Sequence, residues 1–325
     1  MGYFSPVVAL FIVLSCSVAV RVSSASHEDQ SHVRVEDQAG LALQVGAFGD
    51  VYNVRTAQNR VAGRYEVGQL ELGLSASVDP RVGVEAAVAR DGDAFALGVF
   101  AVDFRLMNAE ESFFQAPRAI ESLGVIVGQF DVPFGIDWHV YPSIDRLLVS
   151  TPLIVEDTHG GWNDYGVQGY LHAGRMNAVV YAVNGTAEWA AGGRVGLRVG
   201  GGVEAGFSLA GFYDRDEQLD SQLTGVDAQW SQGSFAAKSE YIRHVPEETN
   251  GAADNTRGLY AQGTWDAGRY FAVVRYGDLR SGAGDRQRLS TGLGWRLLET
   301  CQVRLEYQAD TAADETLISQ LVVEF

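Results

Sequence analysis

Two stretches decide the fold of this chain: residues 124–135, GVIVGQFDVPFG, and residues 163–171, NDYGVQGYL. Apolar residues recur in both at every second position, as Val167, Gly169 and Leu171 do in the second stretch. A period of two is typical of a β-strand with one apolar face. We therefore expect a strand at each end of a long segment that itself has no regular period.

The segment between these two strands is too long for an ordinary connection. In a compact soluble domain, about thirty irregular residues would leave many backbone polar groups without partners. In a membrane barrel, irregular backbone is tolerated where it lines a water-filled lumen. The sequence therefore predicts a long loop, residues 132–164, that folds toward the lumen of a barrel.

The composition supports a barrel that crosses a membrane. The 325 residues are 46% hydrophobic, yet the mean hydropathy is only −0.02, so apolar residues alternate with polar ones instead of forming long runs. Gly is abundant, with 38 residues, and Pro is scarce, with 7. This combination is typical of transmembrane β-barrels, whose strands face lipid on one side and the lumen on the other.

The N-terminus is the exception to this alternation. Residues 1–25 contain the apolar run VVALFIVLSCSVAV and end in small residues at Ser23 and Ala25, which predicts a cleaved secretory signal peptide. Two alternatives stay open: an uncleaved helical anchor, because no Lys or Arg precedes the run, and a lipoprotein attached at Cys16. Residues 26–40 are polar without a period, and we interpret them as a short periplasmic lead before a barrel of residues 41–325.

The charge excludes one class of function. The chain has a formal net charge of −17 and a single lysine, Lys238. Nucleic-acid binding requires a basic surface, so we expect no nucleic-acid partner. After removal of the signal peptide Cys301 is the one cysteine left, which excludes an internal disulfide. Metal-binding spacings such as CxxC or HExxH are not found, and the sequence predicts no cofactor.

Connections of alternating length give the expected strand count. In the second half, short connections such as Gly200–Gly202 and 267–268 alternate with longer ones such as 245–257, an asymmetry typical of bacterial outer-membrane barrels. We predict an all-β, closed antiparallel barrel of sixteen strands, with 14 and 18 as alternatives. The pattern is least regular over residues 91–119, where we assign 91–110 to a second long loop and 111–119 to a strand.

The C-terminal strand supports an outer-membrane barrel. Leu321, Val323 and the terminal Phe325 share one face, and this pattern resembles the signal by which the barrel-assembly machinery recognises its substrates. Tyr and Trp residues stand near strand ends on the apolar face, as in the aromatic girdles that meet the two membrane interfaces. These residues are Tyr213, Trp230, Tyr241, Trp265, Tyr276 and Tyr307. We therefore expect the protein in the outer membrane, in contact with its lipid.

The sequence resembles a known family at three places. GVIVGQFDVPFG, followed by a long loop and NDYGVQGYL, is similar to the phosphate-selective porin O/P superfamily, and so are residues 45–54, VGAFGDVYNV, and the terminal strand. The resemblance implies a porin, a passive diffusion channel for small hydrophilic solutes or ions, for which a homotrimer is one assembly. With one lysine and an acidic composition, we do not extend phosphate selectivity to this chain.

Charged residues predicted to face the lumen are candidates for the pore constriction. Six acidic residues, five within the loop and Asp131 directly before it, stand against Arg146, which favours cations if the loop lines the pore. Opposed basic and acidic walls would create a transverse field, whereas locally paired charges would leave the lumen ordinary. Basic residues predicted to face inward include Arg269 and Arg275. The constriction candidates are Asp137, Asp145, Arg146, Glu156, Asp157, Arg194, Arg198, Lys238, Glu240, Arg296, Arg304 and Glu306.

Other functions have less support in the sequence. His139, Asp157 and His159 lie close in sequence, but a nucleophile motif such as GxSxG is not found, so we predict no enzyme and no catalytic residue. The serious alternative is a closed structural or adhesive outer-membrane barrel, because Phe212, Phe271 and Val273 are predicted to face inward and would fill a lumen. In the loop, Trp138, Tyr141 and Trp162 would either stack against a sugar-like solute or pin the loop to the barrel wall.

Overall fold

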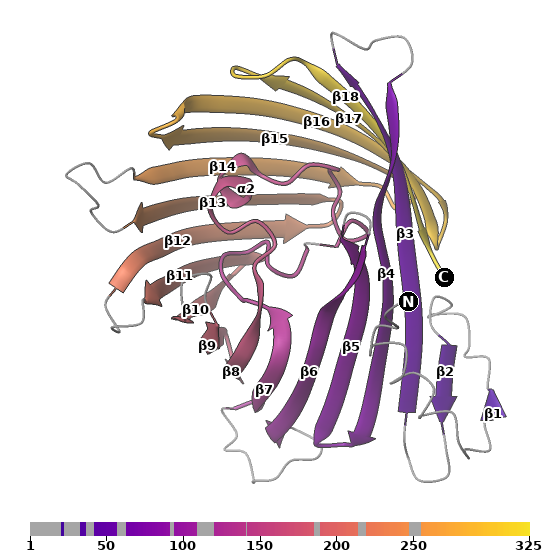
Figure 1. The fold of residues 1–325 in the computed structure, drawn as a ribbon, viewed down its shortest axis with the longest axis vertical. Helices are drawn as coiled ribbons and strands as arrows, with labels where there is room; N and C mark the ends of the chain where they lie inside the picture. Colours follow the sequence, from indigo (N-terminus) through magenta and orange to yellow (C-terminus); the bar gives the residue numbers. More distant parts are fainter. Residues whose placement is uncertain are drawn as a thin grey trace, which may run out of the picture.

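The chain forms a closed antiparallel barrel of sixteen strands, β3 to β18, which confirms the predicted fold (Figure 1). The computed structural model describes residues 21–22, 33–36, 42–56, 63–91, 94–108, 120–140, 142–184, 189–213, 219–246 and 255–325. Each strand pairs with its neighbours in the sequence, so the topology is a simple meander. No helix among these residues is long and apolar enough to cross a membrane.

Most strands run for nine to sixteen residues, long enough to cross a bilayer at a tilt. Their bounds are β3 (Ala42–Thr56), β4 (Arg64–Asp79), β5 (Val82–Asp91), β6 (Ala94–Asn108), β7 (Ser122–Asp131), β8 (Asn163–Ala173), β9 (Met176–Asn184), β10 (Trp189–Gly200), β11 (Val203–Tyr213), β12 (Leu219–Gln232), β13 (Phe235–Pro246), β14 (Thr256–Asp266), β15 (Tyr270–Ser281), β16 (Gly284–Leu298), β17 (Cys301–Asp310) and β18 (Thr316–Glu324).

The barrel closes where the last strand meets the first. β18 pairs with β3 from Thr316 opposite Thr56 to Glu324 opposite Phe48. The remaining edge of β3 pairs with β2 (Val33–Glu36), which in turn pairs with β1 (Arg21–Val22). An open edge invites association with other chains, and β2 covers this one.

The structure corrects the expectation that residues 26–40 are without regular structure, because four of them form β2. The other residues of that lead, and most of the predicted signal peptide, lie outside the described residues.

The count of sixteen strands is confirmed, although one of the predicted strands was misplaced. Residues 94–108 form β6 and not a loop. Register shifts between Ala87 and Val88 and between Arg105 and Met107 interrupt the alternation of apolar residues, which is why the pattern looks irregular. The predicted strand over 111–119 lies outside the described residues.

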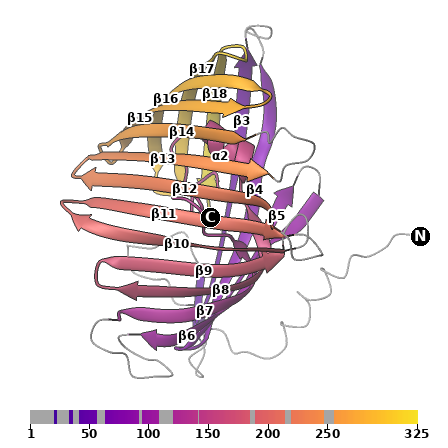
Figure 2. The same ribbon diagram turned by 90° about the vertical axis from the view of Figure 1, so that its left-hand side faces the viewer.

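The two faces of the barrel differ as the alternation predicts. On the outer face of the wall that β13 to β17 form, the side chains of Tyr241, Trp265 and Tyr276 are exposed. On its inner face, Arg304 and Glu306 of β17 are fully buried. Figure 2 shows the strands of this wall side by side. Phe325 and Leu321 of the terminal strand are also exposed. An apolar exterior around a charged interior is the arrangement that a lipid surrounding requires.

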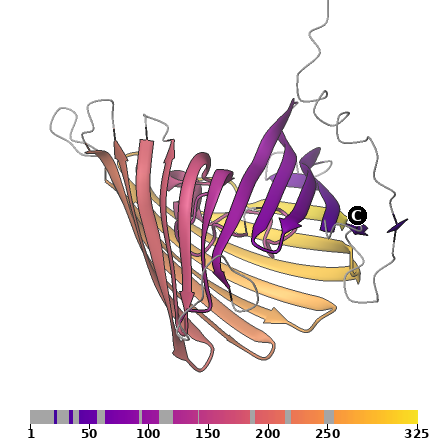
Figure 3. The ribbon, with the colours of Figure 1, turned by 90° about the horizontal axis from the view of Figure 1, so that it is seen from below.

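Most short turns of the β8 to β17 wall lie at one end of the barrel, although two-residue connections also join β5 to β6 and β15 to β16 at the opposite end. The connections between β10 and β11, β12 and β13, and β14 and β15 are two or three residues long, and Figure 3 shows them at the same end of their strands. Gly233 and Gly268 in these turns have φ angles of +59° and +77°, which only glycine adopts without strain. We call this the short-turn end and the opposite end the long-loop end.

Candidate functional site

Residues 132–162, which we call the inner loop, fold into the lumen as predicted (Figure 1). The base of the loop is closed by a hydrogen bond from the Val132 amide to the Trp162 carbonyl, at 2.8 Å. It contains one short helix, α2 (Leu153–Thr158). Since β8 begins at Asn163, Asp164 belongs to a strand, and the predicted loop boundary at residue 164 is too long by two residues.

The root of the inner loop and the helix α2 form a hydrophobic core inside the lumen. Val132 and Phe134 at the root, and Ile154 and Val155 of α2, are at most 1% exposed. Their partners are wall residues from β9 to β15: Tyr181, Val183, Ala190, Ala210, Leu223, Ile242, Tyr260 and Leu279. Around the root of the loop and α2, the lumen is therefore packed like the interior of a soluble protein.

Two glycines in the wall make room for this packing. A Cβ at Gly258 of β14 would stand 3.0 Å from Ile154, and one at Gly225 of β12 would stand 3.3 Å from Phe134. Both distances are closer than side chains normally approach, so larger residues would push the loop from the wall. The wall is shaped to receive these particular side chains.

Aromatic residues hold the end of the inner loop. The Trp162 ring stacks on Phe212 of β11 with ring centres 5.0 Å apart and meets Tyr181 of β9 edge-on at 5.8 Å. Of the two roles considered for Trp162, the structure supports the one that pins the loop. Tyr141 lies outside the described residues.

The first polar anchor is Asp137, which is 4% exposed. Its carboxylate forms an ion pair with Lys238 of β13 and accepts a 2.7 Å hydrogen bond from the Tyr260 hydroxyl. Burial alone would raise the pKa of Asp137, but Lys238 and the hydrogen bonds outweigh burial and hold the pKa below its usual value. Asp137 is thus a charged group whose field Lys238 largely cancels.

The second anchor joins the middle of the loop to β15 and β17. The Ser150 amide donates to Glu306 at 2.9 Å, and the Ser150 hydroxyl also contacts that carboxylate. The Arg275 guanidinium donates to the carbonyls of Ser150 and Thr151, at 2.9 and 3.0 Å. Both wall charges are buried and committed to holding the loop.

The third anchor lies where β3, β17 and β18 meet. The Ser143 hydroxyl donates to Asp50 at 2.6 Å, and Arg304 donates to the carbonyl of Ile144 at 2.8 Å and also to that of Ser143. Gln320 joins the group by donating to Asp50 at 3.0 Å. Arg304 is 1% exposed, so solutes cannot reach it freely.

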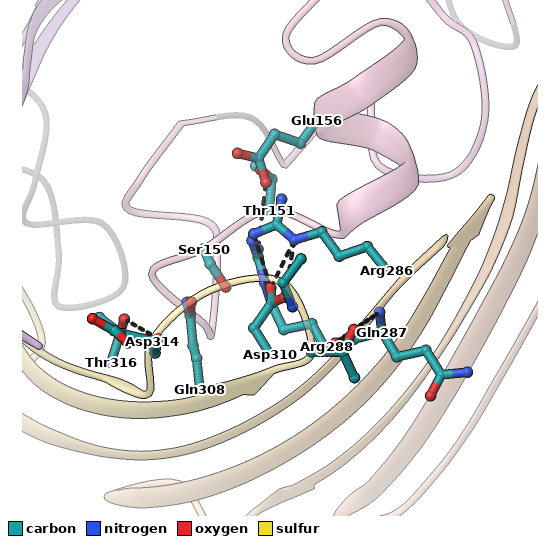
Figure 4. A network of polar contacts seen from close by, with 12 residues as sticks. Ser150, Thr151, Glu156, Arg286, Gln287, Arg288, Gln308, Asp310, Asp314 and Thr316 are labelled. Atoms are coloured by element: carbon teal, nitrogen blue, oxygen red, sulfur yellow. Dashed lines mark hydrogen bonds and ion pairs between the residues drawn. The ribbon is translucent and has the colours of Figure 1, made fainter. Parts of the chain in front are cut away.

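A fourth contact joins α2 to the inner face of the wall near its long-loop end (Figure 4). Arg288 of β16 contacts Glu156 at 3.3 Å and Asp310 of β17 at 3.0 Å, and Arg286 shares Asp310 at 2.8 Å. The carboxylate of Glu156 on α2 therefore contacts Arg288, and Asp310 pairs with both Arg286 and Arg288 and fixes their positions.

Hollows remain on both sides of the inner loop. One hollow, about 700 Å³, is lined by Arg146, Leu148 and Ser150 of the loop and by Lys238 and Gln262 of the wall. Two smaller hollows, about 210 and 400 Å³, follow β3 to β6. Their inward side chains are mostly small or acidic: Gln44, Glu71, Ser75, Ser77, Glu85, Asp103, Arg105 and Glu324.

The wall carboxylates of this second side face the loop. Glu71 of β4 lies within electrostatic range of Glu85, of Asp131 at the end of β7, and of Asp145 in the loop. Burial and the nearby Glu324 raise the pKa of Asp145. The inner loop thus divides the lumen into an anchored side along β9 to β17 and an acidic side along β3 to β6.

Comparison with known structures shows the same fold in bacterial outer-membrane porins. An anion-selective porin from Comamonas acidovorans superimposes with a TM-score of 0.67 over 88% of this chain and 100% of its own, at 12% identity. OmpF of Salmonella typhi gives 0.63 over 87% and 98%, at 8% identity. The channel DcaP of Acinetobacter baumannii gives 0.59 over 89% and 99%, at 11% identity. Neither a protein-family model nor a curated protein sequence matches this chain.

The structure places the predicted constriction residues in different surroundings. Asp137, Lys238, Arg304 and Glu306 are anchors of the inner loop, and Glu156 contacts Arg288. Arg146 and Asp145 line the 700 Å³ hollow. Asp157 is exposed on α2.

The remaining candidates lie on the β10 to β16 wall. Arg194 pairs with the buried Asp227 at 2.8 Å, and Arg296 pairs with Asp266 at 2.8 Å at the short-turn end. Arg198 donates to the Gly174 carbonyl at 2.7 Å. Glu240 is 1% exposed beneath Gly135.

One inward assignment was wrong and several important residues were missed. Arg269 lies in the turn before β15, with its guanidinium 5.7 Å from the centre of the exposed Trp295 ring, and does not face the lumen. Sequence reasoning missed Asp50, Glu71 and Glu85 as site residues. Their inward positions follow from strand alternation, but the bulge between Gly49 and Val51 obscures the alternation there.

Proposed function

We propose that this protein is an outer-membrane porin, a passive diffusion channel for small hydrophilic solutes or ions. The observation that carries the proposal is the hollow acidic side of the lumen, along β3 to β6. The inner loop borders this hollow at Ile144 and is held there by hydrogen bonds from Ser143 to Asp50 and Gln69, but it leaves the hollow open. Small polar residues such as Ser75 and Ser77 line this side. On the opposite side, along β9 to β15, apolar wall residues pack against the loop. The side along β9 to β17 is filled only around the hydrophobic core, because the 700 Å³ hollow lies on that side and reaches Gly202 and Asp266 at the short-turn end. A lumen with these hollows leaves a path for water and solutes.

The charges on this path support a preference for cations. Glu71 and Glu85 lie on the neighbouring strands β4 and β5, Asp145 of the loop lies within electrostatic range of Glu71, and Glu324 lies near Asp145. Of the basic residues that could oppose them, Arg275 and Arg304 are buried in loop anchors, and Arg105, which lines the 400 Å³ hollow, is paired with Asp103 at 3.1 Å. A passage with carboxylates on both sides raises the local concentration of cations. The anion selectivity of the Comamonas porin therefore gives no reason to expect anion selectivity here.

Several finer assignments belong to the same proposal. The resemblance to the phosphate-selective porin O/P superfamily supports a porin, whereas phosphate selectivity finds no lysine-rich or arginine-rich open path among the described residues. Export through the signal peptide of residues 1–25 and recognition of Leu321, Val323 and Phe325 by the barrel-assembly machinery would place the protein in the outer membrane. One structural neighbour, OmpT of Vibrio cholerae, is described in a trimer form, and we propose a homotrimer on that basis.

A closed structural or adhesive barrel is the second candidate. The observation in its favour is the hydrophobic core inside the lumen, which includes Phe134, Ile154 and Tyr260, with Phe212 packed against it. Phe271 and Val273, also predicted to face inward, form a second buried cluster with Leu148. If this packing extended across the lumen in the membrane, solutes would not pass.

Recording current in a planar lipid bilayer separates the two candidates. Purified protein, its folding checked by the shift in gel mobility on heating, should insert in discrete conductance steps if it is a porin. A salt gradient should then give a reversal potential of the sign that cations produce, and the preference should weaken as salt screens the carboxylates. Folded protein that inserts but carries no current would establish the closed barrel. A reversal potential of the anionic sign would leave the porin standing and refute the cation preference.

A further inference from the structure

Arginines from neighbouring strands stand side by side on the outer surface of the barrel. Arg243 of β13 is directly opposite Arg257 of β14, and Arg257 is directly opposite Arg280 of β15. All three are exposed. They share a face with Tyr241 and Leu259, which are 42% and 40% exposed on the side of the wall that turns away from the lumen.

The pair of Arg243 and Arg257 is unusual because nothing within the described residues neutralises it. Neither guanidinium has an ion pair or a hydrogen bond to any part of the chain that the structure describes. Like charges directly opposite each other on one face of a sheet destabilise it. The chain has a net charge of −17 and therefore many carboxylates, yet none of the described ones pairs with Arg243 or Arg257. An anion from outside the chain would relieve this repulsion.

Arg280 differs from the other two. Its Nε atom lies 3.2 Å from Asp278, and Asp285 of β16 is its cross-strand partner. The carboxylates on this part of the described surface therefore gather around Arg280. The unbalanced positive charge is concentrated on Arg243 and Arg257.

The height of the pair on the barrel fits the phosphate level of a membrane. On β14 the exposed Trp265 marks the short-turn end, and Arg257 lies eight positions before it, near the long-loop end. Eight residues of a strand tilted by about 40° rise about 20 Å, close to the ~25 Å height of the apolar band on such barrels. Apolar or aromatic side chains occupy most of the outward positions between them, so the arginines stand at the border of the lipid tails.

We propose that Arg243 and Arg257 together bind the phosphate group of a lipid in the outer leaflet. Two guanidinium groups on adjacent strands present several N–H donors to one phosphate, and arginine matches phosphate oxygens in a bidentate geometry. The bound anion removes the repulsion between the two arginines. Tyr241 and Leu259, one pair lower on the same face, lie beside the acyl chains. This site is independent of whether the lumen conducts.

Native mass spectrometry of the full-length folded protein in detergent tests the site. The probe is a short-chain phosphatidic acid, and the matched control lipid is the diacylglycerol that lacks only the phosphate. We expect phosphatidic acid to bind more tightly to the wild type. Each arginine near a lipid phosphate contributes roughly a fivefold gain in affinity, so the variant R243Q/R257Q should bind it at least tenfold more weakly. R257K should retain part of the affinity for phosphatidic acid, since lysine keeps the positive charge but lacks the bidentate guanidinium.

Control experiments give the proposal a second, independent readout. R269Q removes an exposed arginine from the short-turn end of the same wall and should leave binding unchanged. Without lipid, R243Q/R257Q should melt at the same temperature as the wild type or higher, because the repulsion is gone, and phosphatidic acid should raise only the wild-type melting temperature. Equal binding by wild type and R243Q/R257Q, or equal binding of the two lipids, would overturn the site. Displacement of the lipid by equimolar inorganic phosphate would overturn the lipid as its ligand.

Discussion

The charged wall residues on the two sides of the lumen differ in whether they bind the inner loop. Along β9 to β17, the wall residues Lys238, Arg275 and Arg304 bind atoms of the inner loop and are buried or partly buried. Along β3 to β6, Glu71 and Glu85 have no such partner among the described loop residues, and the hollows beside them are open. The basic residues Lys238, Arg275 and Arg304 therefore hold the loop in place, whereas the carboxylates of Glu71 and Glu85 can meet a solute.

Lumen charge therefore cannot be counted from alternation alone. Alternation places a residue on the inner face, but a loop folded into the lumen decides whether that residue meets solvent or backbone carbonyls. Arg304 is 1% exposed although it faces inward. A buried arginine that donates to loop carbonyls contributes little to the field in the passage, and its removal should act on the loop first.

Deleting the inner loop should have the largest effect. Replacement of residues 134–160 by a short Gly-Ser linker removes the core and all four anchors from the lumen while the hydrogen bonds between strands stay intact. The barrel alone would be wide, so single-channel conductance should rise several-fold, and the cation preference should fall because Asp145 is gone and ions pass farther from Glu71. Planar bilayer recordings measure both. Unchanged conductance would mean that the narrowest point lies elsewhere.

Removing one anchor should loosen the loop without unfolding the barrel. In Arg275→Met, the carbonyls of Ser150 and Thr151 lose their guanidinium donor, and losing a hydrogen bond to a charged group costs roughly 1.5–3 kcal/mol. We expect the loop to be released in part, which proteolysis of residues 142–152 would reveal as faster cleavage. Arg280→Met, on the outer face of the same strand, is the matched control and should leave the cleavage rate unchanged. Equal cleavage of both variants would contradict a structural role for Arg275.

The sequence was sufficient for the fold because the barrel depends on patterns that are local in the chain. Alternation, turn glycines and the lengths of connections predict sixteen strands and the inner loop without any long-range information. They fail at β6, where bulges change which residues face outward. A bulge is set by the register of the neighbouring strand, and that register cannot be read from the strand's own sequence.

The site was less predictable because it depends on contacts between distant parts of the chain. Ser143 contacts Asp50, 93 positions before it, and Ser150 contacts Glu306, 156 positions after it. Nothing in the local sequence marks Ser143 or Ser150 as anchors. For the same reason the sequence predicts Asp137 and Glu156 as constriction candidates but does not identify their partners, Lys238 and Arg288.

The acidic side should control ion selectivity more than the anchored carboxylates do. Glu71→Gln together with Glu85→Gln removes two charges that have no partner among the described loop residues, so the reversal potential in a salt gradient should move clearly toward zero. Asp137→Asn together with Glu156→Gln removes two charges that are already paired with Lys238 and Arg288. This second variant should move the reversal potential less. A larger shift from the second variant would mean that the path follows the 700 Å³ hollow.

Acid should release the inner loop slightly, through His159. Its ring meets Phe134 edge-on with ring centres 5.0 Å apart, and burial lowers the pKa of His159 to about 4 from an ordinary value of 6.5. In a released loop His159 would regain its ordinary pKa. Between pH 6.5 and about 4 the released state therefore binds a proton that the docked state does not. Docking is fully stable above this window and loses up to about 1.4 kcal/mol for each pH unit below 6.5.

Protonation of Asp145 should oppose the release of the loop by acid. Variants of His159 and Asp145 should therefore change the pH dependence of release in opposite directions. The raised pKa of Asp145 in the docked loop means that the docked state takes up a proton more readily than a released loop, so docking gains from Asp145 as the pH falls. Proteolysis of the loop at about pH 7.5 and about pH 5, on either side of the ordinary histidine pKa, should be somewhat faster at the lower pH in the wild type, with a protease active at both values. His159→Phe should abolish or reverse that difference and Asp145→Asn should enlarge it. If His159→Phe kept the wild-type difference, the acid release would come from the anchors and not from the histidine.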